Sequence, residues 1–159
     1  MISYFKILRP INIFILMICF QLTNLILNEN FLNHLSILFV VCILAGFSNT
    51  VNDIIDYKID SANNIKRPIS QNKISIKSAK IFACLLFLSS LIISYFSSFS
   101  SLTNFLIFFI CVPLIVLYTP IFKKIPLFGN IVVSFLISMT FIIFSISIKG
   151  YISGLLLPV

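Results

Sequence analysis

Three of the chain's four acidic residues lie in one nine-residue stretch, Asn52-Asp53-Ile54-Ile55-Asp56-Tyr57-Lys58-Ile59-Asp60. In a helix that turns about 100° per residue, the side chains of Asn49, Asp53, Asp56 and Asp60 fall within an arc roughly 60° wide. Like charges on one helix face repel one another unless cations neutralise them. Such hard oxygen ligands suit Mg²⁺, which combines one or two carboxylates with water and substrate phosphate oxygens. The stretch predicts a Mg²⁺–diphosphate site; the alternative is a solvated acidic helix end balanced by the lysines that follow.

The connection that follows, up to residue 80, brings basic side chains close to these carboxylates. Arg67 offers a planar fork that matches phosphate oxygens, and Lys66 and Lys73 offer point charges. Pro68 is expected to take the chain out of helix after Arg67. Membrane topology alone would also place basic residues here, and Lys77 and Lys80 are assigned to that role. For Arg67, which directly follows the acidic helix, phosphate binding is the favoured interpretation.

Two further polar clusters contain candidate diphosphate ligands. Arg9 and Asn12 stand at the start of the first apolar run. Tyr118, Lys123 and Asn130 follow the fourth apolar run, around two prolines that mark a turn between helices. Interfacial anchoring and topology signals explain these residue types equally well. Their expected position on the same side of the membrane as the acidic stretch is what makes them candidate substrate ligands.

The composition belongs to an integral membrane protein. Hydrophobic residues make up 60% of 159 positions and charged residues only 9%. Five apolar runs approach the length that crosses about 30 Å of hydrocarbon as helix: Ile11 to Leu27, Leu35 to Val51, Ile81 to Phe96, Leu102 to Tyr118 and Leu127 to Ile148. A sixth run begins near Tyr151. We therefore predict an all-α, multi-pass transmembrane helix bundle in which residues 1–159 form one membrane-embedded domain.

The net charge of +7 does not indicate nucleic-acid binding, because the basic residues alternate with the apolar runs. Ten of the eleven lie before the first run or in the second and fourth connections, and Lys149 alone lies on the other side. The positive-inside rule makes the side with ten basic residues cytoplasmic. We expect a plasma-membrane protein whose N-terminus and residues 52–80 face the cytoplasm.

These residues together resemble the UbiA superfamily of intramembrane prenyltransferases. Asn52-Asp53-x-x-Asp56-x-x-x-Asp60 carries the family's first aspartate-rich pattern in full. Weaker matches follow the family's order along the chain: Arg9-Pro10-Ile11-Asn12, Arg67-Pro68-Ile69-Ser70, Leu117-Tyr118, Lys123-Lys124 and Gly129-Asn130. The start at Arg9-Pro10-Ile11-Asn12 and the whole stretch from Lys123 to Asn130 look most similar to the archaeal branch that joins a geranylgeranyl group to geranylgeranylglyceryl phosphate.

The resemblance implies nine transmembrane helices around a lipid-accessible cavity, with two aspartate-rich motifs that hold two Mg²⁺ ions and a prenyl diphosphate. By the same resemblance, Asn52, Asp53 and Asp56 would hold the first metal with support from Asp60. Arg67, Lys123 and Tyr118 would contact the diphosphate. Its departure would leave an allylic carbocation for an acceptor hydroxyl or aromatic carbon to attack. A quinone precursor or a chlorin is the alternative acceptor.

The chain departs from the family pattern because it contains no acidic residue after Asp60. The family places its second aspartate-rich motif after the sixth helix, so the chain is expected to cover little more than the first half of the fold. Three interpretations stay open: an enzyme or an enzyme half that a second polypeptide completes, a catalytically inactive remnant, and a small membrane scaffold or transporter. The first is favoured, with little transfer activity expected from this chain alone.

Overall fold

The computed structural model of the chain describes residues 2–149, which contain helices and no strand. The sixth apolar run expected near Tyr151 lies outside these residues. Five of the described segments are long and apolar enough to cross a membrane. This confirms the all-α, multi-pass class and the five expected spans.

Short helices connect or precede the membrane-length segments. The elements in chain order are α1 (Ile2–Ile7), α2 (Pro10–Leu27), η1 (Phe31–His34), α3 (Leu35–Ala62), α4 (Ile76–Phe96), α5 (Ser101–Phe105), η2 (Leu106–Cys111), α6 (Val112–Tyr118), η3 (Phe122–Lys124) and α7 (Phe128–Lys149). The fourth span consists of α5, η2 and α6 together.

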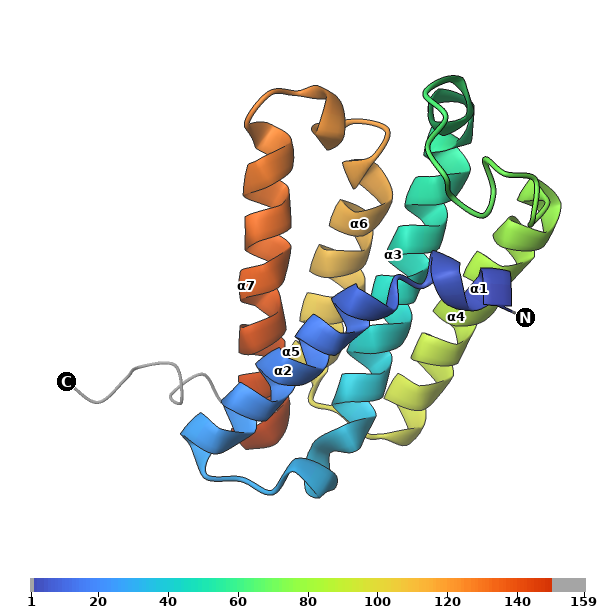
Figure 1. Cartoon of the computed structure of the whole chain (residues 1–159). Helices are drawn as coiled ribbons and strands as arrows, with labels where there is room; N and C mark the ends of the chain where they lie inside the picture. The colour runs from blue at the N-terminus through green and yellow to red at the C-terminus, as the bar shows by residue number, and fades with distance from the viewer. Residues whose placement is uncertain (1, 150–159) are drawn as a thin grey trace.

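The helices α3, α4, α6 and α7 stand side by side, and α2 crosses them obliquely (Figure 1). Phe20 of α2 packs edge-to-face on Phe144 of α7, with ring centroids 5.0 Å apart, in a core that also contains Ile37, Val40 and Ile107. Many large apolar side chains on the outer faces of the helices stay exposed. This distribution is typical of helices whose outer surfaces contact lipid.

Helix α3 extends well past its apolar run. The run ends at Val51, whereas the helix continues to Ala62 and reaches about 42 Å in length. Since the hydrocarbon core is about 30 Å thick, the last turns of α3 extend beyond it. The expectation that Pro68 would end this helix was wrong: α3 already ends at Ala62, and Asn64, with a φ of +53°, turns the chain back. Asparagine tolerates this left-handed conformation better than most residues.

A π-helical turn, η2, interrupts the fourth span at Leu106–Cys111. Pro113 follows it directly in the first turn of α6, and proline has no amide N–H to donate to the helix ladder. Such π-helical turns are common at functional sites. The apolar run alone does not distinguish this turn from regular helix, so the sequence did not predict it.

Candidate functional site

The polar face of α3 points into the protein. Asp53, Asp56 and Asp60 are 2%, 5% and 3% exposed, and Asn49 on the same face is also buried. Lys58, on the opposite face of these turns, is exposed. The predicted shared face is therefore present, and it is buried rather than solvated as the alternative required. We call Asn49, Asn52, Asp53, Asp56 and Asp60 the aspartate face.

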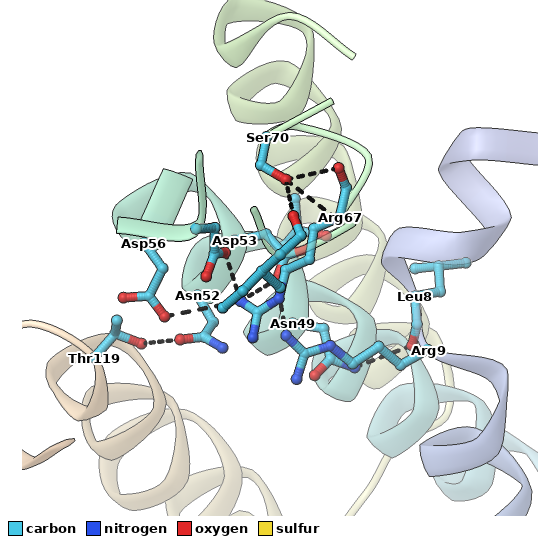
Figure 2. A network of polar contacts seen from close by, with 12 residues as sticks. Leu8, Arg9, Asn49, Asn52, Asp53, Asp56, Arg67, Ser70 and Thr119 are labelled. Carbon is cyan, nitrogen blue, oxygen red and sulfur yellow. Dashed lines mark hydrogen bonds and ion pairs between the residues drawn. The ribbon is translucent and has the colours of Figure 1, made fainter. Parts of the chain in front are cut away.

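Arg67 lies within 4 Å of all three carboxylates of the aspartate face; Figure 2 labels it together with Asp53 and Asp56. Its Nη1 lies 3.0 Å from Asp53 Oδ1, 2.9 Å from Asp60 Oδ2 and 3.8 Å from Asp56 Oδ2. The connection after α3 positions it through Ser70, whose hydroxyl accepts from the Arg67 amide at 3.1 Å and donates to the Ile65 carbonyl at 2.6 Å. The downstream arginine thus folds back onto the helix that precedes it.

Arg9 approaches the aspartate face from the turn between α1 and α2. Its Nη2 donates to Asp53 Oδ1 at 2.8 Å. Arg9 has a φ of +54°, a left-handed conformation that costs energy for a residue with a side chain. Asn49 stabilises this turn, because its Nδ2 donates to the Leu8 carbonyl at 3.0 Å (Figure 2). In this structure Asn49 therefore positions Arg9.

The connection between α6 and α7 supplies two further contacts. Lys123 Nζ lies 2.5 Å from Asp56 Oδ2, and the Thr119 hydroxyl lies 2.8 Å from the side-chain amide of Asn52. The hydrogen bonds of the Asn52 side chain are best satisfied when its amide oxygen and nitrogen exchange places. In that orientation its Nδ2 donates to Thr119 and to Asp56, and its Oδ1 accepts from Arg9. Asn52 therefore links the two ends of the polar network.

The formal charges of this network sum to zero, because it contains three carboxylates and three basic side chains. One buried atom, Asp60 Oδ2, has no hydrogen bond although Arg67 is near, because the guanidinium N–H does not point at it. No group of three carboxylate, imidazole or thiol side chains within residues 2–149 could hold a metal ion by itself. Mg²⁺ does not need such a group, since one or two carboxylates with water and phosphate oxygens complete its octahedron. The hard oxygens of Asn52, Asp53 and Asp56 fit that requirement.

Comparison with known proteins decides the family. The sequence profile of the UbiA prenyltransferase family matches residues 9–159. This chain belongs to that family. Its aspartate face thus lies on a helix of a UbiA-family protein, as the spacing of the acidic residues and the resemblance predicted.

The relatives of this UbiA-family chain include digeranylgeranylglyceryl phosphate synthases. That of Methanosphaera stadtmanae is 33% identical over 156 residues, which cover 97% of this chain and 56% of the relative. That of Methanococcus aeolicus is 42% identical over 106 residues, 67% of this chain and 36% of the relative. A solved structure reported for digeranylgeranylglyceryl phosphate synthase in membranes aligns with a TM-score of 0.82 and 27% identity over 92% of this chain. The chain spans about half of that structure, 53%.

The remaining residues predicted for the site make no contact with the aspartate face through a hydrogen bond or ion pair. Asn12 and Asn130 are exposed, and Tyr118 is half-buried, each without a side-chain hydrogen bond within residues 2–149. Lys66 lines a separate pocket with Lys6 and Lys73. Sequence reasoning missed Thr119, whose only signal is its position at the end of the fourth span beside Pro120.

An apolar pocket of about 450 Å³ opens between α3, α4 and α6. Phe47, Val51 and Ile54 of α3 line it, and they point away from the aspartate face because they lie on the opposite side of the helix. None of the carboxylates borders it. This pocket is therefore separate from the polar network and does not define the candidate site.

Proposed function

We propose that this chain binds an isoprenyl diphosphate at its aspartate face and contributes that site to a membrane prenyltransferase. One observation carries the proposal: three buried aspartates share one helix face with basic side chains that converge on them from three different segments. Burying three carboxylates costs stability, so binding of a ligand explains their presence better than a contribution to folding does. Membership of the UbiA family supports the same conclusion.

The basic residues of the site would bind the diphosphate. Arg9 and Arg67 present planar forks suited to phosphate oxygens, and Lys123 presents a compact charge. Cations held in place before the reaction stabilise the negative charge that develops on a leaving diphosphate as its carbon–oxygen bond breaks. The allylic cation left behind would be attacked by the acceptor's hydroxyl oxygen, which then loses its proton. The apolar helices would keep water away from that cation.

Magnesium is the cofactor proposed for this site. Asn52, Asp53 and Asp56 would hold the ion with Asp60 in support, and the ion would supply positive charge beside the diphosphate. Asp60 Oδ2 is buried and makes an ion pair with Arg67 but no hydrogen bond, and this supports a cation here, because a buried carboxylate oxygen without a hydrogen bond costs free energy.

The proposed acceptor is geranylgeranylglyceryl phosphate, which would place the reaction in ether-lipid synthesis. Support comes from the similar proteins named digeranylgeranylglyceryl phosphate synthase. A quinone precursor or a chlorin is the alternative acceptor within the same chemistry. A second polypeptide, carrying another aspartate-rich motif, is the proposed partner, because two Mg²⁺ ions acting as a clamp need more than one carboxylate cluster.

The test is transfer of labelled geranylgeranyl diphosphate to geranylgeranylglyceryl phosphate or to an aromatic acceptor in liposomes with Mg²⁺. The purified chain is assayed alone and together with a second polypeptide, which is the part of a digeranylgeranylglyceryl phosphate synthase that the chain does not align with. We expect little turnover alone and turnover with the added part, lost in Asp53→Ala. Turnover onto the aromatic acceptor only would overturn the proposed acceptor. Failure to bind the diphosphate at all would favour an inactive remnant or a scaffold.

A further inference from the structure

The Thr119 hydroxyl meets the aspartate face from a different helix. Thr119 directly follows α6 and is 3% exposed, and its Oγ1 lies 2.8 Å from the side-chain amide of Asn52 on α3 (Figure 2). Thr23 and Thr50 instead donate to carbonyls four residues earlier in their own helices. The Thr119 side chain is therefore directed at Asn52, one of the residues proposed to hold Mg²⁺.

Thr119 and Asp56 together hold the nitrogen of the Asn52 amide. In the orientation that satisfies both ends of the amide, Nδ2 lies 2.8 Å from Thr119 Oγ1 and 3.1 Å from Asp56 Oδ2. An asparagine amide has two N–H donors, so each of these oxygens accepts one. Asp56 decides which end of the amide is the nitrogen, because a carboxylate only accepts. Thr119 accepts from the second N–H, which would otherwise lack a partner.

The oxygen of the Asn52 amide faces a position that a cationic group already occupies. Oδ1 lies 3.3 Å from Arg9 Nη2, and the same nitrogen lies 2.8 Å from Asp53 Oδ1. Two hard oxygens from neighbouring residues of α3 thus converge on one cationic group. Oxygen ligands of this kind suit Mg²⁺. The Asn52 oxygen is available to a cation only while the amide nitrogen is held on the other side.

The Thr119 hydroxyl suits this role better than a charged acceptor does. Asp56 is itself a proposed ligand and also pairs with Lys123, so a bound cation would compete for the oxygen that accepts from Asn52. Thr119 is neutral and buried, and it continues to accept when the carboxylates turn toward a cation. Hydrogen-bond partners that orient a metal ligand typically contribute about 10- to 100-fold to metal affinity.

We propose that Thr119 is a positioning residue whose hydroxyl holds the Asn52 side chain with its oxygen toward the cation site of the aspartate face. Thr119 acts through Asn52 and is not itself a ligand. The inference rests on the proposed function, because it assigns Thr119 a role at the Mg²⁺ that Asn52, Asp53 and Asp56 would hold.

The test is a Mg²⁺ titration of geranylgeranyl diphosphate binding by the detergent-purified chain. Thr119→Val keeps the shape of the side chain but removes the hydroxyl, and Thr119→Ser keeps the hydroxyl. Thr140→Val is the matched control, because the Thr140 hydroxyl donates within α7, to the Ile137 carbonyl at 2.7 Å. We expect Thr119→Val to need about tenfold more Mg²⁺ for half-maximal binding, and the other two variants to need as much as the unaltered chain.

Binding of the diphosphate without Mg²⁺ separates positioning from a general loss of structure. It is expected to be equal in these four proteins, because the basic side chains of the site are unchanged. A Thr119→Val chain that loses this binding as well would overturn the inference in favour of a packing role. A Thr119→Ser chain that behaves as Thr119→Val does would overturn the role of the hydroxyl.

A double variant tests whether Thr119 acts through Asn52. Asn52→Ala removes the amide, so adding Thr119→Val to it is expected to weaken the response to Mg²⁺ no further. An additional loss in the double variant would overturn positioning through Asn52. A full response to Mg²⁺ in Thr119→Val would overturn this inference alone. An unaltered chain whose diphosphate binding does not respond to Mg²⁺ would overturn the proposed metal site itself, and the inference with it.

Discussion

Arg67 Nη1 lies within 4 Å of a carboxylate oxygen of Asp53, of Asp56 and of Asp60. One guanidinium therefore offsets much of the repulsion among three buried carboxylates. It competes for the same oxygens that a divalent cation would bind. The conformation described here keeps the aspartate face neutral with the protein's own cations, and a ligand must rearrange these ion pairs to bind.

We predict that Arg67→Ala destabilises the protein by roughly 2–3 kcal/mol, because it leaves buried carboxylates without their shared partner. Mg²⁺ is expected to recover part of this loss, and to stabilise Arg67→Ala more than the unaltered chain. Unfolding in mixed micelles, with and without Mg²⁺, measures both effects. Arg67→Lys serves as the control that keeps the charge. Identical Mg²⁺ stabilisation of all three proteins would contradict competition for the carboxylates.

At the scale of the helices, one ion pair ties the end of α7 to the connection between α2 and η1. Lys149 Nζ donates to Glu29 Oε1 at 2.6 Å, and His34 Nε2 lies 3.9 Å from Glu29 Oε2. The hydrogen bond from Lys149 and its charge lower the pKa of Glu29, with a smaller contribution from His34. This contact lies at the opposite end of the bundle from the aspartate face.

We predict that this contact makes a small, pH-dependent contribution to stability. Because the folded-state pKa of Glu29 is lowered, the contribution is present above its ordinary value of about 4.3 and is lost as pH falls through the lowered value. Glu29→Gln should lower the melting temperature near pH 6 but not near pH 3. Thermal unfolding of both proteins across this range measures the difference. A difference that stays constant, or increases on acidification, would contradict the assignment.

The helical elements were largely predictable because their signals are local. Periodicity placed Asp53, Asp56 and Asp60 on one face, and the apolar runs gave the number of spans, although α3 extends eleven residues beyond its run, to Ala62. The contacts to Thr119 and the separation of Lys66 from Arg67 depend on how distant segments fold back, and no local pattern encodes them. The π-helical turn at Leu106–Cys111 escaped prediction because it contains the same apolar residues as a regular helix.

For the whole molecule, the distribution of charge bears on its orientation. Ten of the eleven basic residues lie at the end of the bundle that contains the aspartate face, or in the segments leading to it, and Lys149 lies opposite. We propose that the end with the aspartate face is cytoplasmic. The soluble diphosphate group of a substrate would then meet Arg9, Arg67 and Lys123 at that surface.

We predict that a cysteine at Asn63 is labelled only from the cytoplasmic side, and a cysteine at Ser98 only from the other side. Both positions are exposed; Asn63 directly follows α3 and Ser98 follows α4. The background should lack the native thiols, Cys19, Cys42, Cys84 and Cys111. Membrane-impermeant maleimide, applied to intact cells and to inverted vesicles, makes the measurement. Labelling of Asn63→Cys from outside intact cells would reverse the topology.

The most direct test of the central claim is binding of geranylgeranyl diphosphate with and without Mg²⁺. Asp53→Asn and Asp56→Asn each remove one charge from the aspartate face, and Glu29→Gln removes one at the other end of the molecule. We predict that the two aspartate variants bind at least about tenfold more weakly and lose the dependence on Mg²⁺, whereas Glu29→Gln binds as the unaltered chain does. Equal, Mg²⁺-independent binding by all four proteins would contradict the assignment of the aspartate face as a metal–diphosphate site.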